Sequence, residues 1–181
     1  MSGHSQIEPI LLLQDIDQRS REHAQGLPQQ IEVKSTWDGV GFRLGNLRLV
    51  APLDDVLEIF PYPRLTRVPG AKNWLKGIAN VRGTLLPIND LVGFLGLGTA
   101  ELGRQARVMV VRHKAIMVGL VVDEVLGMRH FPEEERTEEM PSVDEQVSRY
   151  LHGAFRQEGR LWGVFSMQTL VESTDFVKVA A

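Results

Sequence analysis

The chain has 181 residues, of which 43% are hydrophobic and 24% are charged, as is normal for a soluble globular protein with one ordinary domain or two small ones. Its formal net charge of −3 is too small to favour a general attraction to nucleic acid or to an anionic membrane. Because the sequence has no cysteine, it excludes disulfides and thiolate metal sites, which suits a reducing cytoplasm.

Residues 1–30 predict an N-terminal helical extension. Its aliphatic residues, Ile10 to Leu13 and Ile16, precede a polar half that ends at Gly26-Leu27-Pro28. The segment has no basic region typical of a signal peptide, and no apolar run reaches the roughly 20 residues of a transmembrane helix. We therefore expect a cytoplasmic protein without direct membrane insertion. The helix either packs on its own domain or docks a partner, and we expect packing because an exposed aliphatic run favours aggregation.

The segment that follows predicts short strands. From Trp37 to Val50, apolar and charged residues alternate on both sides of Gly45-Asn46, which is typical of a hairpin with one buried face. Residues 56–60 form a further apolar run, and Pro61-Tyr62-Pro63 ends it.

A basic stretch, residues 64–82, stands out on this slightly acidic chain. It contains Arg64, Arg67, Lys72, Lys76 and Arg82, and no acidic residue occurs between Ile59 and Asn89. Within and after it, the apolar runs 77–81 and 84–88 meet at Arg82-Gly83, which predicts a hairpin or a bent strand pair.

The second half of the chain repeats this pattern. Residues 107–125 predict strands around a turn at His113-Lys114, and residues 153–155 and 161–165 predict a final strand pair. Residues 167–171 have helical periodicity. The acidic segment from Phe131 to Glu145 is expected to be a solvated loop.

An internal duplication connects the two halves. Matching corner glycines and strand patterns predict two similar small β-barrels in tandem, which we place at residues 31–103 and 104–181. A shift of 69 residues places Leu47, Leu49, Leu53, Asp54, Asp55, Val56 and Leu57 on Ile116, Val118, Val122, Asp123, Glu124, Val125 and Leu126, and a shift of 76 places Leu75, Gly77, Gly83, Leu85 and Ile88 on Leu151, Gly153, Gly159, Leu161 and Val164.

The two copies differ at the hairpin corner of residues 80–83. Asn80 corresponds to Arg156, and Arg82 corresponds to Glu158. A shared fold explains only shared residues, so Arg82 is either an interaction residue or one half of a structural salt bridge, with Glu58 as the expected partner.

Motifs of catalysis and cofactor binding do not stand out in the sequence. The histidines have no metal-ligand spacing, and neither a nucleophile elbow nor a phosphate-binding glycine loop is present. Asp54-Asp55 and Asp123-Glu124 recur in both copies, so a structural role explains these pairs better than catalysis does. We expect no enzyme activity, no cofactor and no metal.

The stretch TRVPGAKNWLKGIANVRGTLLPINDL resembles the signature of CheW-type chemotaxis adaptors, and the resemblance extends through Val108 to Asp123 and covers about residues 40–170. It implies a mainly β fold of two SH3-like five-stranded β-barrels packed together, with short helices, over residues 31–181. With its N-terminal extension the chain is most similar to the adaptors of chemosensory systems that control type IV pilus twitching motility.

The resemblance also implies a function. Such a protein is a non-catalytic adaptor that couples the cytoplasmic tip of a methyl-accepting chemoreceptor to a CheA-type histidine kinase, in receptor–kinase arrays near the inner membrane. The positions associated with receptor binding in this family are Val56, Glu58, Gly77, Arg82 and Gly83.

A second hypothesis is a small β-barrel that binds single-stranded nucleic acid through the basic 64–82 stretch. Aromatic residues are not interleaved with these basic residues, as a base-stacking platform would require. We therefore expect no nucleic-acid partner.

Overall fold

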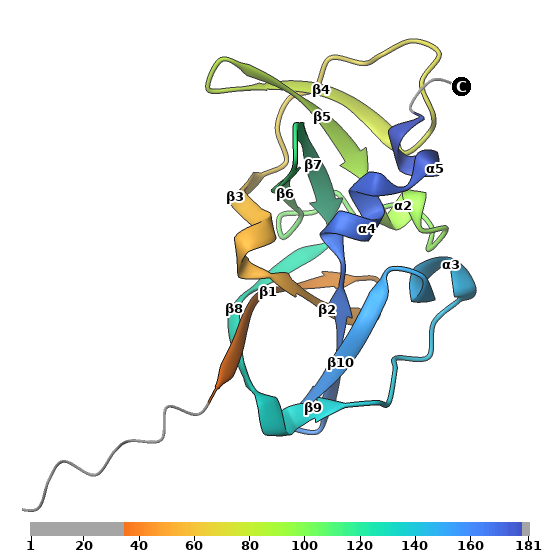
Figure 1. Cartoon of the computed structure of the whole chain (residues 1–181). Helices are drawn as coiled ribbons and strands as arrows, with labels where there is room; N and C mark the ends of the chain where they lie inside the picture. Colours follow the sequence, from red (N-terminus) through yellow and green to blue (C-terminus); the bar gives the residue numbers. More distant parts are fainter. Residues whose placement is uncertain (1–34, 179–181) are drawn as a thin grey trace, which may run out of the picture. The chain divides into compact units, whose positions relative to one another are not determined.

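The computed structural model describes residues 35–178, which form two β-sheets with a few short helices (Figure 1). This confirms the expected mainly β fold class. The predicted N-terminal helix lies outside the described residues. No helix in the described part of the chain is long and apolar enough to span a membrane.

The hydrogen-bonded order of strands defines the two sheets. The six-stranded sheet has the order β8-β1-β2-β11-β10-β9, and the five-stranded sheet has the order β3-β6-β7-β5-β4. The first contains β1 (Thr36–Leu44), β2 (Leu47–Pro52), β8 (Glu124–Pro132), β9 (Arg136–Thr137), β10 (Leu151–Gln157) and β11 (Arg160–Phe165), and the second contains β3 (Val56–Pro61), β4 (Leu75–Val81), β5 (Thr84–Asp90), β6 (Arg107–His113) and β7 (Ile116–Val122).

The predicted division into consecutive barrels at residues 103 and 104 is wrong. Each sheet takes strands from both halves of the chain, because the chain changes sheet inside each repeat. The 3-10 turn η1 (Leu53–Asp55) carries the chain from β2 into β3 of the other sheet, and Asp123 carries it back from β7 into β8. Each sheet is thus built from the first hairpin of one repeat and later strands of the other, three in the five-stranded sheet and four in the six-stranded sheet.

The duplication itself is visible in the geometry. Replacing each strand of the order β3-β6-β7-β5-β4 by its equivalent in the other repeat gives β8-β1-β2-β11-β10. In both sheets the first hairpin of one repeat joins the other repeat through a parallel pair, β2 with β11 and β5 with β7. Gly77 and Gly153 lie at equivalent register shifts with φ of 149° and 146°.

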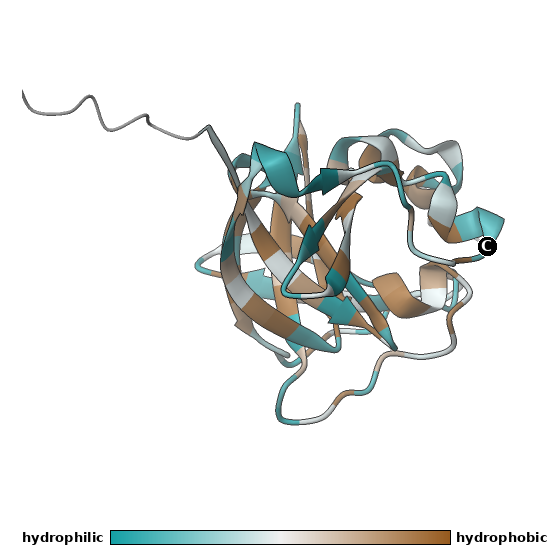
Figure 2. Ribbon diagram, turned by 90° about the horizontal axis from the view of Figure 1, so that it is seen from below, coloured by the Kyte–Doolittle hydropathy of each residue, from teal (hydrophilic) through white to brown (hydrophobic). Residues whose placement is uncertain are grey.

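The core occupies the inside of both sheets and the space between them. Along the strands, hydrophobic and hydrophilic residues alternate (Figure 2), so one face of each sheet is buried. Inside the six-stranded sheet Phe131, Phe155 and Trp162 form an aromatic cluster, with Phe131 and Phe155 stacked at 4.7 Å between ring centroids. In the five-stranded sheet, Thr66 exchanges two backbone hydrogen bonds of 2.9 Å with Ile78 of β4, so the segment after β3 joins the opposite edge strand.

Short helices follow the strands at equivalent places. Asp90 accepts a hydrogen bond from the Gly93 amide at the start of α2, and Ser166 accepts one from the Thr169 amide at the start of α4. The helices are α2 (Leu91–Phe94), α3 (Glu145–Ser148), α4 (Met167–Glu172) and α5 (Thr174–Val177).

The acidic segment 131–145 is more structured than predicted. Phe131 is fully buried at the end of β8, and Glu133–Glu135 form the 3-10 turn η2. Arg136 and Thr137 then pair with β10 as strand β9. The expectation of a solvated loop therefore holds only after Thr137, because the aromatic core holds the first part against the sheet.

Candidate functional site

Strand β3 exposes apolar side chains on the outside of its sheet. Its residues alternate between half-buried and exposed, and the exposed set includes Leu57 at 45% and Ile59 at 38%. Since Val56 and Phe60 fill the inner face, the strand is apolar on both faces. Exposed aliphatic side chains on an otherwise folded strand mark a candidate contact surface.

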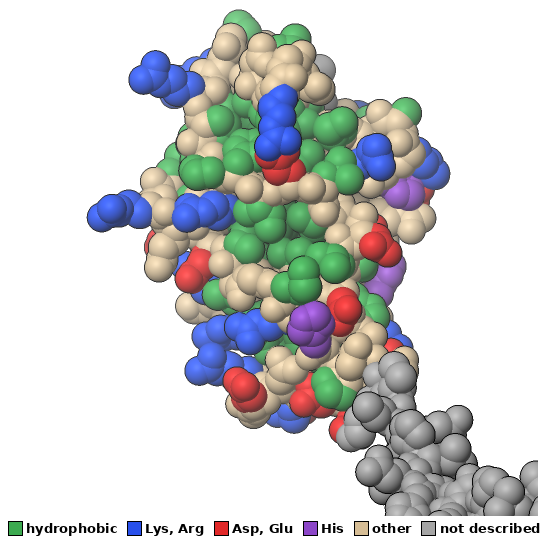
Figure 3. All heavy atoms as spheres, turned by 90° about the vertical axis from the view of Figure 1, so that its left-hand side faces the viewer, with side chains coloured by type: hydrophobic (Ala, Val, Ile, Leu, Met, Phe, Trp, Pro, Cys, Tyr) green, Lys and Arg blue, Asp and Glu red, His purple; other side chains and the backbone are tan. Residues whose placement is uncertain are grey.

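Two adjoining hollows lie along β3, and together they define what we call the β3 groove. One, of about 190 Å³, is lined by Val81, Arg82 and Leu86 of the β4–β5 hairpin and by Val110 and Met117. The other, of about 230 Å³, lies where the two sheets meet and is lined by β3, Gly127 and Met128. Leu57 and Glu58 line both hollows. The face of the molecule that includes β3 shows hydrophobic side chains gathered across its centre (Figure 3).

Arg82 extends over this groove from the tip of the β4–β5 hairpin. Arg82 and Gly83 form the two-residue turn, with φ of 52° and 85°, and the Asn80 side chain accepts a hydrogen bond of 2.9 Å from the Gly83 amide. A turn with two left-handed residues matches the twist of a hairpin. Asn80 therefore has a structural task in holding the turn that presents Arg82.

The Arg82 guanidinium donates a hydrogen bond of 2.6 Å to Glu58 Oε1. The Arg82 side chain is 81% exposed, whereas Glu58 is 31% exposed. An ion pair this exposed contributes about 0–1 kcal/mol to the free energy of folding, so a stabilising role does not explain well why an arginine occupies this position. Most of the guanidinium edge remains open to a partner, and guanidinium groups bind carboxylates and carbonyls in a forked geometry.

The structure brings together four of the five positions predicted for receptor binding. Val56 and Glu58 line the groove, and Arg82 lies over it with Gly83 beside it in the turn. Gly77 lies elsewhere, because it is buried in β4 and a Cβ there would lie 2.5 Å from the Thr66 carbonyl oxygen. Gly77 admits a close approach of this chain's own backbone.

Sequence reasoning missed the apolar residues of the groove. Leu57 and Ile59 could have been identified from the sequence. A strand that carries apolar residues on both faces exposes one of those faces when only the other packs on the core. Met117 and Met128 come from β7 and β8, and only the fold places them beside β3. Their exposed fractions are 38% and 57%.

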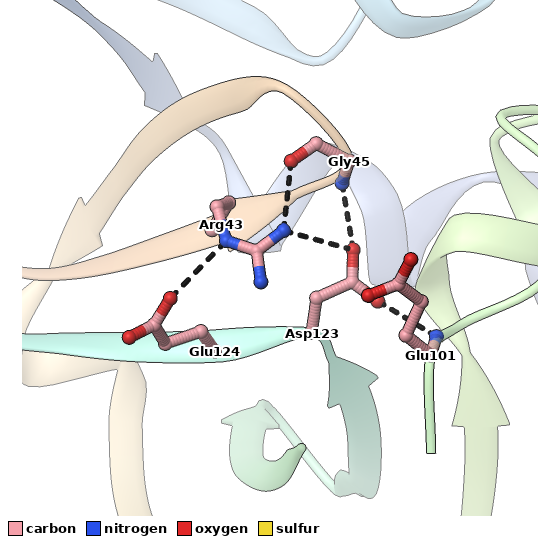
Figure 4. Close-up of polar contacts among 5 residues, drawn as sticks. All are labelled: Arg43, Gly45, Glu101, Asp123 and Glu124. Atoms are coloured by element: carbon pink, nitrogen blue, oxygen red, sulfur yellow. Dashed lines mark hydrogen bonds and ion pairs between the residues drawn. The ribbon is translucent and has the colours of Figure 1, made fainter. Parts of the chain in front are cut away.

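The buried carboxylates are engaged in structural bonds. Asp123 is 4% exposed and accepts hydrogen bonds from the amides of Gly45 (2.7 Å) and Glu101 (2.9 Å), while Arg43 lies between Asp123 and Glu124 (Figure 4). This arrangement joins the β1–β2 turn to the crossover between the sheets. Asp90 forms an ion pair of 3.0 Å with Lys76. In the described residues no group of three or more His, Cys, Asp or Glu side chains is placed to hold a metal ion.

Residues 38–175 match the CheW-like domain family. The chain is 48% identical over 172 residues to Protein PilI of Pseudomonas aeruginosa. This match covers 95% of this chain and 96% of that protein. It is 24% identical to the chemotaxis protein CheW of Thermotoga maritima, over 74% of this chain and 86% of that one.

A solved structure shares the fold. The scaffolding protein TtCheW from Thermoanaerobacter tengcongensis superimposes with a TM-score of 0.68 at 23% identity. The match covers 78% of this chain and 96% of that protein.

Proposed function

The chain belongs to the CheW-like family, and on this premise we propose that it is a non-catalytic adaptor that couples a chemoreceptor to a CheA-type histidine kinase. The observation that carries the proposal is the β3 groove, an exposed apolar surface at the junction of the sheets with Arg82 above it. An adaptor acts by binding other proteins, and the groove presents apolar side chains, Glu58 and Arg82 for such binding.

The partner that we assign to the groove is the helical cytoplasmic tip of a methyl-accepting chemoreceptor. A helix with an apolar stripe can lay its side chains against Leu57, Ile59 and Met128. Val56 and Glu58 line the contact, and Arg82, presented by the Gly83 turn, receives a carboxylate or carbonyl of the partner. Gly77 supports the site from within by letting Thr66 close on β4.

The pathway that we propose controls type IV pilus twitching motility. The support is the 48% identity with Protein PilI, which extends over 95% of the chain. The likeness to the CheW of Thermotoga maritima, at 24% identity, is lower over a smaller part of the chain. In this role the protein works in the cytoplasm, at receptor–kinase arrays near the inner membrane, without inserting into it.

We further propose that the protein has no catalytic activity and requires no cofactor. The supporting observation is that the carboxylate oxygens of the buried Asp90 and Asp123 accept hydrogen bonds from backbone amides, and that Asp90 also forms an ion pair with Lys76. A general acid or base needs a carboxyl group that can reach a substrate proton.

The structure gives no support to the nucleic-acid alternative. Trp74 is the aromatic residue within the basic 64–82 stretch. It is half-buried and stacks on Phe176 with ring centroids 5.7 Å apart, so one of its faces is already covered. Binding of single-stranded nucleic acid uses free aromatic faces.

Affinity capture with the full chain as bait tests the proposal. We expect a chemoreceptor and a CheA-type kinase among the proteins identified by mass spectrometry. The variant Leu57→Lys places a charge in the groove and should lose the receptor, whereas Met140→Lys, at 38% exposure outside the groove, should retain it. Equal capture of the receptor by all three proteins would contradict the groove assignment.

A further inference from the structure

Another hollow lies away from the β3 groove, along the long connection between β3 and β4. This connection crosses the five-stranded sheet on its way from one edge strand to the other (Figure 1). We call it the basic hollow; its volume is about 430 Å³. Its polar lining residues include Tyr62, Arg67, Lys72, Asn73 and Lys76.

Residues next to the lining of the basic hollow are held in place by the fold. On one side Thr66 is bonded to Ile78 through two backbone hydrogen bonds. On the other side the Trp74 ring stacks on Phe176 of α5, and Lys76 is fixed by its ion pair with Asp90. These contacts fix the backbone on both sides of the hollow, so binding of a ligand has to order mainly the exposed side chains of Arg67 and Lys72.

The electrostatic character of the hollow is positive. None of its lining residues is acidic, and Arg67 and Lys72 form no ion pair with any residue that the structure describes. Lys76 is compensated by Asp90, so the uncompensated charge comes from Arg67 and Lys72, with the exposed Arg64 nearby in sequence. Burial raises the pKa of the Tyr62 hydroxyl against the opposing effect of Lys76, so the hydroxyl stays protonated as a donor at neutral pH.

The fold does not require this positive charge. In the other repeat, a shift of 76 residues places the connection on residues 138–150, which contain Glu138, Glu139, Asp144 and Glu145 against the single basic residue Arg149. Equivalent connections of one duplicated fold thus carry opposite charge. Arg67 and Lys72, which among the described residues have no such partner as Lys76 has in Asp90, are therefore not required by the architecture.

The hollow also has apolar lining. Leu65, Ala71 and Leu75 line it, together with Val68 and Leu102, which are 38% and 51% exposed. A free inorganic anion gains nothing from such side chains, whereas a peptide that carries both carboxylates and an aliphatic side chain uses both kinds of lining.

From this combination we propose that the basic hollow is a second docking site, which binds an acidic peptide segment of a partner protein through Arg67 and Lys72 and seats one aliphatic side chain of that segment against Val68 and Leu102. Tyr62 and Asn73 supply neutral hydrogen-bonding groups to the peptide. The site is separate from the β3 groove, since the two share no lining residue.

Fluorescence polarisation with the full chain and a labelled octapeptide, Glu-Glu-Leu-Glu-Glu-Leu-Glu-Glu, tests the proposal. We expect saturable binding that weakens as NaCl is raised, and a large loss for the same peptide with Gln in place of Glu. Replacing its leucines by glycine should also weaken binding, because the aliphatic anchor is removed.

Charge-reversal variants locate the site. Arg67→Glu and Lys72→Glu should each weaken peptide binding about tenfold, since a reversed charge repels the carboxylates. The matched control is Arg160→Glu, an exposed arginine at the start of β11 in the other sheet, and it should change binding less than about twofold. Arg82→Glu should also retain the peptide, which separates this site from the β3 groove. Equal losses in Arg160→Glu, or no saturable binding at about 1 mM protein, would overturn the proposal.

Two further results would replace the proposed partner by another. If inorganic phosphate displaces the peptide better than NaCl does at equal ionic strength, the hollow is a small-anion site. If the chain self-associates in sedimentation experiments and Arg67→Glu abolishes the association, the occupant is a second copy of this chain. Either result would contradict docking of a separate acidic partner.

Discussion

Arg82 and Glu158 occupy the same turn position in the two repeats, with φ angles of 52° and 51°. A left-handed conformation costs roughly 1–2 kcal/mol for a residue with a side chain, so its presence in both repeats belongs to the hairpin geometry. The identity of the side chain is left free by the fold. In one repeat it is an arginine that reaches Glu58, and the proposed partner contact at the β4–β5 turn uses this difference.

Arg82→Glu should leave the fold intact and weaken receptor coupling. The 81% exposed side chain contributes little to folding, so the melting temperature should change by less than about 3 °C. Removing a charge-assisted hydrogen bond to the partner should cost roughly 1.5–3 kcal/mol of binding free energy. Circular dichroism and a receptor binding isotherm measure the two effects. An unfolded variant would mean that Arg82 is structural.

A charge swap separates the ion pair from the partner contact. The double variant Glu58→Arg with Arg82→Glu can restore the internal pair but not the positive charge at the hairpin tip. We expect the swap to remain defective in receptor binding. The control Glu158→Lys changes a charge at the equivalent turn and should bind normally. Full recovery by the swap would indicate that the pair itself, rather than Arg82 as a contact, is required.

Asp123→Asn should destabilise the protein more than Glu124→Gln. Asp123 is buried and accepts hydrogen bonds from two backbone amides. The NH2 group of an asparagine at this position would face one of these amides, so a donor would meet a donor. The expected loss is about 2–3 kcal/mol of unfolding free energy. Glu124 is 30% exposed and contacts Arg43, so its loss should cost less than about 1 kcal/mol. Urea unfolding compares the two, and equal losses would show that Asp123 does not anchor the crossover.

The strands could be predicted from the sequence, but their pairing could not. Alternation between Phe42 and Leu44, or between Leu47 and Leu49, states which face is buried and where the turn lies. The alternation does not indicate which other strands pair with these strands in a sheet. The exchange of hairpins between repeats depends on where η1 and Asp123 redirect the chain, and these turns are set by tertiary hydrogen bonds such as that from Gly45 to Asp123.

The candidate site divides in the same way. Arg82 and its pairing with Glu58 could be predicted, because the two repeats differ at residue 82 and Glu58 lies on the preceding strand. The Met128 contribution could not, because this residue reaches β3 only through the exchange of β8 into the other sheet. Local patterns thus identified charged contacts, whereas the apolar groove required the three-dimensional fold.

Glu172 should contribute to the acid sensitivity of the fold. Hydrogen bonds from Lys114 (2.5 Å) and His113 (2.8 Å) hold the pKa of its carboxyl group at about 2, below the ordinary value of 4.5. Because the pKa is lowered in the folded state, the stabilisation is fully present above about pH 4.5 and is lost as the pH falls toward 2. Wild type and Glu172→Gln should therefore differ in stability at neutral pH and converge near pH 2. A constant difference in urea midpoint across this range would contradict the assignment.

Gly77→Ala should be much more destabilising than Gly153→Ala. The two glycines hold equivalent positions with φ of 149° and 146°, so the backbone strain of an alanine is closely matched. At Gly77 the new Cβ would lie 2.5 Å from the Thr66 carbonyl oxygen, whereas nothing lies within 4 Å at Gly153. The difference between the two variants therefore measures the packing of the segment after β3 onto β4, which we expect to be about 1–3 kcal/mol. Thermal melts of both variants give the comparison. If they melt together, Thr66 moves away without cost, and a role for Gly77 in partner contact becomes the better explanation of its place in the chain.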